Sequence, residues 1–421
     1  MRLCARIYLF TLVFLLGTAP TIQADQKKSA FPDVEDAVGV FAEQLPSDMT
    51  EGQVEFAAKH YVGSQKLSLS ITRKLRRYNP DFIVLHYHLG IWQQQPRHNF
   101  IVDGEHWGND WQEVNQHEDW FWHNEKGERV RSSGDGKYLM NITNPAFQEY
   151  WKTSITEQMK KGHYQGVFLD SSSIDLLQGE VSKSDTRLSK KAAGDRVFAE
   201  LGGITWREAY ERFMTSLTDF IERSGFASIP NIGPRFTVWD KTDYYTTASG
   251  AFVENAFMTT NVADWRFAVE KILELTKRNK IVIFQPYLKN DPDIERRMYF
   301  LSCYLLIKGR YSYINYFSNN HLSWYPEFNI RLGKPILSLD RLDDLVDAGV
   351  YRRQFERGEV YVNSTGSVRT VNLKKACWKV IPQGGGPVSR QGQASGNLEY
   401  KEVSEIVLAP WSGEILLYDR P

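Results

Sequence analysis

The feature that most constrains the fold of this chain is a series of eight short apolar runs that alternate with helical patterns. Apolar runs of this length, bounded by Gly, Pro, Asn or Ser, are typical of strands that are buried on both faces. A parallel sheet with a helix between successive strands, closed into a (β/α)₈ TIM barrel, accounts for the alternation. The predicted strands are 37–41, 59–63, 82–87, 166–170, 229–232, 250–254, 281–285 and 311–316, of which the second has the weakest pattern.

Helical patterns fit between these runs. A helix is predicted to begin at Pro145, because Asn144 before it is a favourable capping residue and proline is favoured at the first helical position. Its buried stripe is Phe147, Trp151, Ile155 and Met159, which lie on one helical face.

The first 24 residues have the layout of a secretory signal peptide. Arg2 and Arg6 precede an apolar stretch at 7–17, and small residues end at Ala24. The apolar stretch is too short to span a bilayer comfortably. We therefore expect cleavage after Ala24 and a secreted or periplasmic protein, with a retained N-terminal anchor as the alternative.

The charge balance excludes some classes of partner. The chain has 51 basic and 51 acidic residues, and removing residues 1–24 takes away two arginines and no acid. A neutral chain of this kind is not expected to bind nucleic acid. No other segment has a transmembrane pattern, so no stable membrane insertion is expected after cleavage, and no oligomeric state is indicated. Cys303 and Cys377 are expected to stay unpaired, with Cys303 in the core.

A long insertion follows the third predicted strand. Residues 89–144 hold five of the twelve tryptophans, namely Trp92, Trp107, Trp111, Trp120 and Trp122. Insertions of this length are usually functional or disordered, and the tryptophan density argues against disorder. We therefore predict that the insertion forms a cleft wall on which sugar rings stack, with Trp107, Trp120 and Trp122 as substrate-binding candidates. A second insertion, at 171–203, is polar.

The pattern changes after about residue 331. Short strand-like pieces at 360–363, 367–373, 377–381, 405–408 and 414–418 alternate with turns such as Gly384-Gly385-Gly386-Pro387. This pattern predicts a small antiparallel β domain. The expected division is a signal peptide at 1–24, a catalytic barrel at 25–334 and a C-terminal β domain at 335–421.

Two carboxylates stand at predicted strand ends, Asp170 on the fourth strand and Glu254 on the sixth. The carboxyl ends of barrel strands are where catalytic residues lie, and a carboxylate pair is what glycoside hydrolysis needs. Hydroxyl residues after Asp170 favour an ionised nucleophile or base, whereas the apolar residues before Glu254 favour a general acid. The structural alternatives are that Asp170 caps the next helix and that Glu254 pairs with Arg235 or a lysine.

Other polar residues near the strand ends are candidates for substrate binding. His86 and His88 share one face of a strand, as metal ligands do. The later strand ends offer no further His or Cys ligand, so we expect neither a metal nor another cofactor. The two histidines are instead predicted to bind sugar hydroxyls, or in one case to be a core histidine. Further candidates are Asn231, Gln285, Tyr316 and the loop residue Asp175. For the first three, packing or a hydrogen bond to the backbone is the alternative role.

Several of these segments together resemble a known family. Residues 164–170, Tyr-Gln-Gly-Val-Phe-Leu-Asp, resemble the G-[FY]-x-G-[VIL]-F-[LM]-D signature of putative glycoside hydrolases, except that His163 replaces its first Gly. Phe252-Val253-Glu254-Asn255 resembles the sixth strand of polygalactosaminidase-type barrels. With 351–358 leading into 360–363, the chain is similar to the hypothetical glycosyl hydrolase family 15.

The resemblance implies a barrel with Asp170 and Glu254 in catalytic positions, followed by a C-terminal β-sandwich. It implies no particular sugar. Where related barrels carry a third acid at a strand end, this chain is expected to offer only Asp175 or Asp243, both in predicted loops.

The sequence therefore predicts a secreted glycosidase that cleaves O-glycosidic bonds of an oligo- or polysaccharide, with retention of configuration. The rival hypothesis is a catalytically inactive carbohydrate-binding barrel. A polysaccharide-modifying hydrolase or lyase is a weaker third. The sugar, the linkage and endo or exo action are not indicated.

Overall fold

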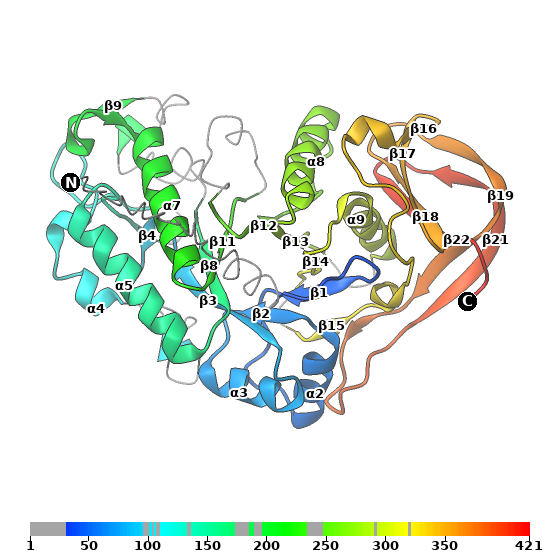
Figure 1. Ribbon diagram of the computed structural model, residues 1–421, viewed down its shortest axis with the longest axis horizontal. Coiled ribbons are helices and arrows are strands. Elements are labelled where there is room, and N and C mark those ends of the chain that lie inside the picture. Colours follow the sequence, from blue (N-terminus) through cyan, green and yellow to red (C-terminus); the bar gives the residue numbers. More distant parts are fainter. Residues whose placement is uncertain are drawn as a thin grey trace, which may run out of the picture.

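A computed structural model of the chain shows a barrel joined to a β domain (Figure 1). It describes residues 31–95, 110–132, 136–172, 185–188, 196–233, 247–289, 293–318 and 321–421, with the backbone of 101–102 and 105–106. The predicted signal peptide and the candidates Trp107, Asp175 and Asp243 lie outside these residues, as does Arg235.

Eight parallel strands form the barrel. Their order around the sheet is β11-β8-β3-β2-β1-β14-β13-β12. A parallel bridge between Asn231 and Phe252, with Ile232 N–H donating to the Phe252 carbonyl at 3.1 Å, joins β11 to β12 and closes the ring. The strands are β1 (Gly39–Ala42), β2 (Gly63–Gln65), β3 (Ile83–Leu89), β8 (Gly166–Asp170), β11 (Ala227–Pro230), β12 (Gly250–Glu254), β13 (Ile281–Gln285) and β14 (Ser312–Ile314).

Helices cover the outside of the barrel between successive strands. They are α2 (Glu51–His60), α3 (Leu69–Tyr78), α5 (Pro145–Gly162), α7 (Trp206–Arg223), α8 (Val262–Lys277) and α9 (Ile294–Ile307). The α5 helix begins at Pro145 as predicted, because Asn144 Oδ1 accepts hydrogen bonds from the first free N–H groups. Its predicted stripe, Phe147, Trp151, Ile155 and Met159, is buried. No helix in the described part of the chain is long and apolar enough to cross a membrane.

The second strand lies later in the chain than its pattern predicted. Residues 59–60 belong to the end of α2, and the strand is the three-residue β2. Gly63, Ser64 and Gln65 carry no apolar side chain, so the strand has no hydrophobic signature of its own. It is fixed instead by backbone pairing with β1 and β3.

The described part of the insertion after β3 forms a small folded layer on the barrel. Its described elements are β4 (Trp92–Gln93), the short helix α4 (Trp111–Val114), a 3₁₀ turn at Glu118–Trp120 and β7 (Tyr138–Leu139), with β5 (Ile101–Val102) and β6 (Glu105–His106) traced by their backbone. The second insertion contains β9 (Val197–Phe198), β10 (Ile204–Thr205) and 3₁₀ turns at Thr186–Leu188 and Ala199–Leu201.

The C-terminal region is an antiparallel β-sandwich, coloured orange to red in Figure 1. A six-stranded sheet has the order β16-β17-β18-β22-β19-β21. Its strands are β16 (Val346–Asp347), β17 (Val350–Phe355), β18 (Gly358–Asn363), β19 (Arg369–Gln383), β21 (Asn397–Leu408) and β22 (Ser412–Leu417). A register shift between Asn372 and Cys377 breaks the long β19–β21 ladder. A separate apolar cluster, which includes Val371, Ile406 and Leu416, fills the interior of this domain.

The β domain packs on the barrel through α9. In Figure 1, α9 lies between the barrel strands and the pair β18 and β22, and it contacts both. Val360 and Ile415 belong to the same apolar cluster as the barrel core. Two further contacts join the parts: β15 (Ser323–Trp324) pairs with β20 (Gly386–Pro387), and the fully buried Arg297–Glu327 ion pair reaches the Gly384 carbonyl. Cys303 and Cys377 are both buried and free.

Candidate active site

Asp170 is the last residue of β8 and stands at the carboxyl end of the barrel. Its Oδ2 accepts a hydrogen bond from the Tyr87 hydroxyl at 2.7 Å, and its Oδ1 accepts one from the Asn231 amide at 3.0 Å. Removal from water raises the pKa of Asp170, but the ammonium groups of Lys66 and Lys137 and these two hydrogen bonds outweigh that effect. The pKa therefore lies below its ordinary value, and the carboxylate is ionised at neutral pH.

Glu254 ends β12, two strands away around the ring. Its Oε1 accepts a short hydrogen bond from the Tyr287 hydroxyl, and its Oε2 accepts one from Asn231 Nδ2 at 2.9 Å. Both described partners are polar, so the side chain does not lie in the wholly apolar setting that the preceding residues of β12 indicated. Those residues, Ala251 and Val253, are buried in the barrel wall instead.

Asn231 joins the two carboxylates. Its single amide nitrogen lies 3.0 Å from Asp170 Oδ1 and 2.9 Å from Glu254 Oε2, so these two oxygens are at most about 5.9 Å apart, the sum of the two distances. Asn231 directly follows β11, at the bridge that closes the barrel. The structure thus brings three of the predicted site residues together at the closing seam.

A third carboxylate and a lysine complete the group, and neither was among the predicted site residues. Lys66 follows β2, and its ammonium forms a short ion pair with Oε1 of Glu43, which follows β1. The same ammonium lies 5.0 Å from the ring centre of Tyr87. The negative charges of Glu43, Asp170 and Glu254 outweigh the desolvation of Lys66 and raise its pKa. Glu43 corrects the expectation that only Asp175 or Asp243 could supply a further acid.

Gln285 ends β13 and lies behind the carboxylates. Its amide nitrogen donates to Glu43 Oε2 and lies 3.2 Å from the Tyr287 hydroxyl oxygen. The side chain is fully buried, so Gln285 holds other site residues and is not exposed to a ligand. This corrects the expectation that Gln285 binds substrate directly.

The backbone is unusual at three of these strand ends. Lys66, Ser171 and Asn255 directly follow β2, β8 and β12, and all three have left-handed backbone angles, with φ of 56°, 51° and 56°. Such angles are costly for residues other than glycine, and they cluster at functional sites. His163, which replaces the glycine of the family signature, has φ of 51° at the end of α5, a conformation that glycine adopts at no steric cost.

The two histidines of β3 lie on the helix side of that strand, opposite Tyr87. His88 packs edge-on against Trp151 of α5, with ring centres 4.7 Å apart, and its Nδ1 donates to the Leu89 carbonyl. His86 stacks on Tyr164. Burial lowers the pKa of His86 to about 3, so it is neutral. This corrects the expectation that His86 and His88 bind substrate hydroxyls: alternation along the strand directs Tyr87 into the barrel and the histidines out of it.

Two of the predicted stacking tryptophans are core residues. Trp120 packs on His117 and Tyr150, and Trp122 packs edge-on against Trp206 with ring centres 5.4 Å apart. Trp122 Nε1 also donates to Asp185 at 3.2 Å. The two side chains are only 5% and 2% exposed, which corrects the expectation that they line a cleft.

Tyr316 is likewise a packing residue. Its hydroxyl donates to the Arg297 carbonyl at 2.9 Å, and its ring packs on Tyr325 and Phe328. The side chain is 4% exposed, so it does not offer a hydroxyl to a ligand. Among the described residues, no group of three or more His, Cys, Asp and Glu side chains is arranged to hold a metal ion.

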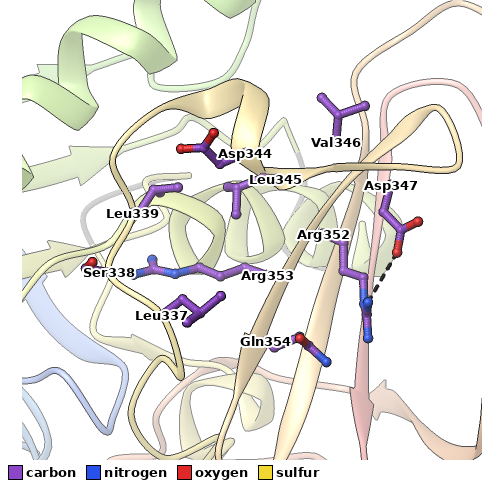
Figure 2. A pocket seen from close by; sticks show the side chains of 10 residues that line it. All are labelled: Leu337, Ser338, Leu339, Asp344, Leu345, Val346, Asp347, Arg352, Arg353 and Gln354. Carbon is purple, nitrogen blue, oxygen red and sulfur yellow. Dashed lines mark hydrogen bonds and ion pairs between the residues drawn. The ribbon is translucent and has the colours of Figure 1, made fainter.

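A separate hollow lies in the β domain, and none of the carboxylates at the barrel strand ends lines it (Figure 2). Its two arginines are engaged: Arg352 pairs with Asp347 and Glu359, and Arg353 donates to carbonyl oxygens at the end of α9. It presents no facing pair of carboxylates. Its lining consists of Leu337, Ser338, Leu339, Asp344, Leu345, Val346, Asp347, Arg352, Arg353 and Gln354.

Several glycoside-acting enzymes are similar in structure to this chain. An Anoxybacillus α-amylase matches with a TM-score of 0.42 and 9% identity over 91% of this chain and 98% of its own. A Flavobacterium johnsoniae dextranase complexed with glucose matches with a TM-score of 0.48 and 8% identity over 92% of this chain and 52% of its own. A Paenibacillus cycloisomaltooligosaccharide glucanotransferase matches with a TM-score of 0.41 and 9% identity over 92% of this chain and 56% of its own. This chain thus spans about half the length of the last two.

Comparison with curated proteins gives no match. At the level of families, the profile of the hypothetical glycosyl hydrolase family 15 matches residues 76–359, which is more than half of the 421 residues and includes both Asp170 and Glu254. The protein therefore belongs to the hypothetical glycosyl hydrolase family 15 and is a glycosidase.

Proposed function

We propose that the protein hydrolyses O-glycosidic bonds of an oligo- or polysaccharide by double displacement with retention, using Asp170 as nucleophile and Glu254 as acid and base. The observation that carries the proposal is the shared hydrogen-bond donor Asn231, which holds oxygens of the two carboxylates within about 5.9 Å of each other. Carboxyl separations of about 5–5.5 Å accompany retention, whereas inversion needs roughly 6.5–9.5 Å to admit a water molecule.

The surroundings of the two side chains suit these different roles. Asp170 is kept ionised by Lys66, Lys137, Tyr87 and Asn231, as a nucleophile must be. Glu254 is oriented by Tyr287 and Asn231 at the ends of its carboxylate. In the first step Asp170 attacks the anomeric carbon, while Glu254 passes a proton to the departing glycosidic oxygen. In the second step Glu254 takes a proton from water, whose oxygen displaces Asp170 from the sugar.

The test begins with a panel of polysaccharides and 4-nitrophenyl glycosides, with detection of reducing ends or nitrophenol. The variants Asp170→Asn and Glu254→Gln nearly preserve shape, and each is expected to lower kcat by a factor on the order of 10² or more. Proton NMR of the first-formed anomer then distinguishes retention from inversion.

Three results would contradict parts of the proposal. Near-wild-type turnover in either amide variant would remove that residue from catalysis. Initial formation of the inverted anomer would exclude Asp170 as a nucleophile. Binding of a panel sugar by both the wild type and Asp170→Asn, without reducing ends from either, would favour the non-catalytic carbohydrate-binding barrel.

A further inference from the structure

We infer that the Glu43–Lys66 ion pair is a positioning device for the reaction, in which Lys66 holds Asp170 in its ionised form and Glu43 holds Lys66 in place. The inference rests on the proposed function for its kinetic test, and it assigns roles to two residues outside the Asp170–Glu254 pair.

The first argument is the location of the pair. Glu43 and Lys66 follow adjacent barrel strands, β1 and β2, at the same end of the barrel as the catalytic carboxylates. Their side chains are only 11% and 14% exposed. Ion pairs at such depth cost free energy through desolvation, and many would be replaced by apolar residues without loss of stability. Stability alone therefore does not explain why a buried ion pair lies beside the two catalytic carboxylates, whereas a role in the reaction does.

The second argument is that the pair is connected to both carboxylates. Lys66 lies over the ring of Tyr87, whose hydroxyl donates to Asp170. On the other side, Glu43 accepts from Gln285, which also contacts the Tyr287 hydroxyl, and Tyr287 donates to Glu254. Asn231 joins Asp170 to Glu254 and so completes a ring of contacts around the barrel mouth.

The third argument is electrostatic. The described charged and titratable groups that face Asp170 are Lys66, Lys137 and Tyr87, with Glu43, Glu254 and Tyr287 beyond them. Lys137 donates to Ser171 Oγ, from the insertion side. Lys66 contacts Glu43 and is attracted by all three carboxylates, and its charge has the largest effect among those that keep Asp170 ionised. When the Asp170 carboxylate is consumed in the glycosyl bond and released again, Lys66 favours its return to the ionised form.

The kinetic test is the acid limb of the kcat/KM profile, measured with the panel substrate that the wild type turns over. Lys66→Gln removes the positive charge, so the limb should move to higher pH by about one unit. Glu43→Gln leaves the charge of Lys66 but removes the carboxylate that holds it, so the limb should move in the same direction by a smaller amount. Lys66→Arg keeps the charge and should leave the limb near its wild-type position.

The matched control is Arg352→Gln in the β domain. Arg352 and Glu359 form an ion pair of similar burial, 17% and 5% exposed, and lie far from the carboxylates in sequence and fold. This variant should lose thermal stability without moving the limb. If Lys66→Gln and Glu43→Gln also lose only stability or kcat, with the limb unmoved, the positioning role is wrong even though Asp170→Asn is inactive.

A second readout needs no substrate. In a double-mutant cycle of Lys66→Gln and Asp170→Asn, the losses in melting temperature should be non-additive at pH 7, because each variant removes one partner of the same attraction. The non-additivity should fade at a pH below the pKa of Asp170, where the carboxyl is neutral. Additive losses at pH 7 would overturn the inference, and this outcome is independent of whether the panel contains a substrate.

Discussion

Asn231 is the residue whose chemistry is most restricted by its position. One amide nitrogen donates to carboxylates on two different strands, which requires two N–H groups on one atom. Aspartate has almost the same shape, but it would put a third negative charge between Asp170 and Glu254.

We predict that Asn231→Asp moves the acid limb of the kcat/KM profile to higher pH by more than about one unit, because carboxylates that share a site cannot all ionise at their ordinary pKa. Asn231→Ala removes the donor without adding charge, so its limb should move less. The comparison is made by pH–rate measurements on both variants. An Asn231→Asp enzyme with the wild-type profile would mean that the bridge does not control ionisation.

The same residue-level chemistry sets a pH dependence of stability. The pKa of Asp170 is lower in the folded protein than its ordinary value. Its ionisation therefore contributes stability that is present above the unfolded pKa of about 3.9 and is lost as the pH falls through the folded pKa. Asp170→Asn should accordingly flatten the acid side of the melting temperature plotted against pH, relative to the wild type. An acid side as steep as that of the wild type would assign the effect to other carboxylates.

At the scale of elements, the insertion after β3 is held to the barrel by its tryptophans. Trp122 fills a space between Trp206 of α7 and Phe198 of β9, and it anchors Asp185. Removing so large a buried side chain leaves a cavity. We predict that Trp122→Ala lowers the free energy of unfolding by about 3–5 kcal/mol, as measured by urea denaturation.

The control for this prediction is Trp111→Ala in the same insertion, because Trp111 is only half-buried and should cost less. Oligosaccharide binding by folded Trp122→Ala should match that of the wild type. Weakened binding with unchanged stability would mean that Trp122 lines a substrate cleft, as predicted from the sequence.

Strands were predictable where their own side chains carry the signal. The apolar runs of β8, β12 and β13 end at Asp170, Glu254 and Gln285, as the sequence indicated. The strand β2 carries no apolar side chain, and the predicted strand 59–63 ended two residues too early, which hid Lys66. Glu43 was missed for a similar reason, since β1 ends at Ala42 and the expected strand ended one residue earlier.

Side-chain roles were less predictable than strand ends. Asp170 and Glu254 could be named because they end strands whose position was known, and Asn231 because it lies beside such a strand end. The directions of His86, His88 and Tyr316 depend on packing against α5 and on the 3₁₀ turn at Pro326–Asn329, which no local pattern reveals. Tryptophan density in the insertion predicted folded structure, which its described residues have, but it did not separate stacking surfaces from core.

At the scale of the whole molecule, the β domain and the barrel share one apolar core across α9. This close approach depends on Gly413 in β22. A Cβ atom added at Gly413 would lie 2.4 Å from Cβ and 2.6 Å from Oγ of Ser302 in α9. Ser302 is fully buried, and its hydroxyl has no hydrogen-bond partner among the described residues. Gly413 therefore packs directly against Ser302. Removing the Ser302 hydroxyl would break no hydrogen bond with a described residue.

We predict that Gly413→Ala separates β22 from α9 and lowers the free energy of unfolding by about 1–3 kcal/mol. The added Cβ lies too close to Ser302, so the backbone of β22 or α9 must shift to make room for it. Ser302→Gly alone should cost about 1 kcal/mol, the usual helix penalty of glycine. The double variant should lose less free energy of unfolding than the sum of the two single losses, because the Ser302 side-chain atoms that oppose the new Cβ at position 413 are gone. Thermal unfolding of all four proteins, followed by near-ultraviolet circular dichroism, measures this coupling. Additive losses would mean that β22 and α9 adjust independently and that the barrel and the β domain are not joined at this contact.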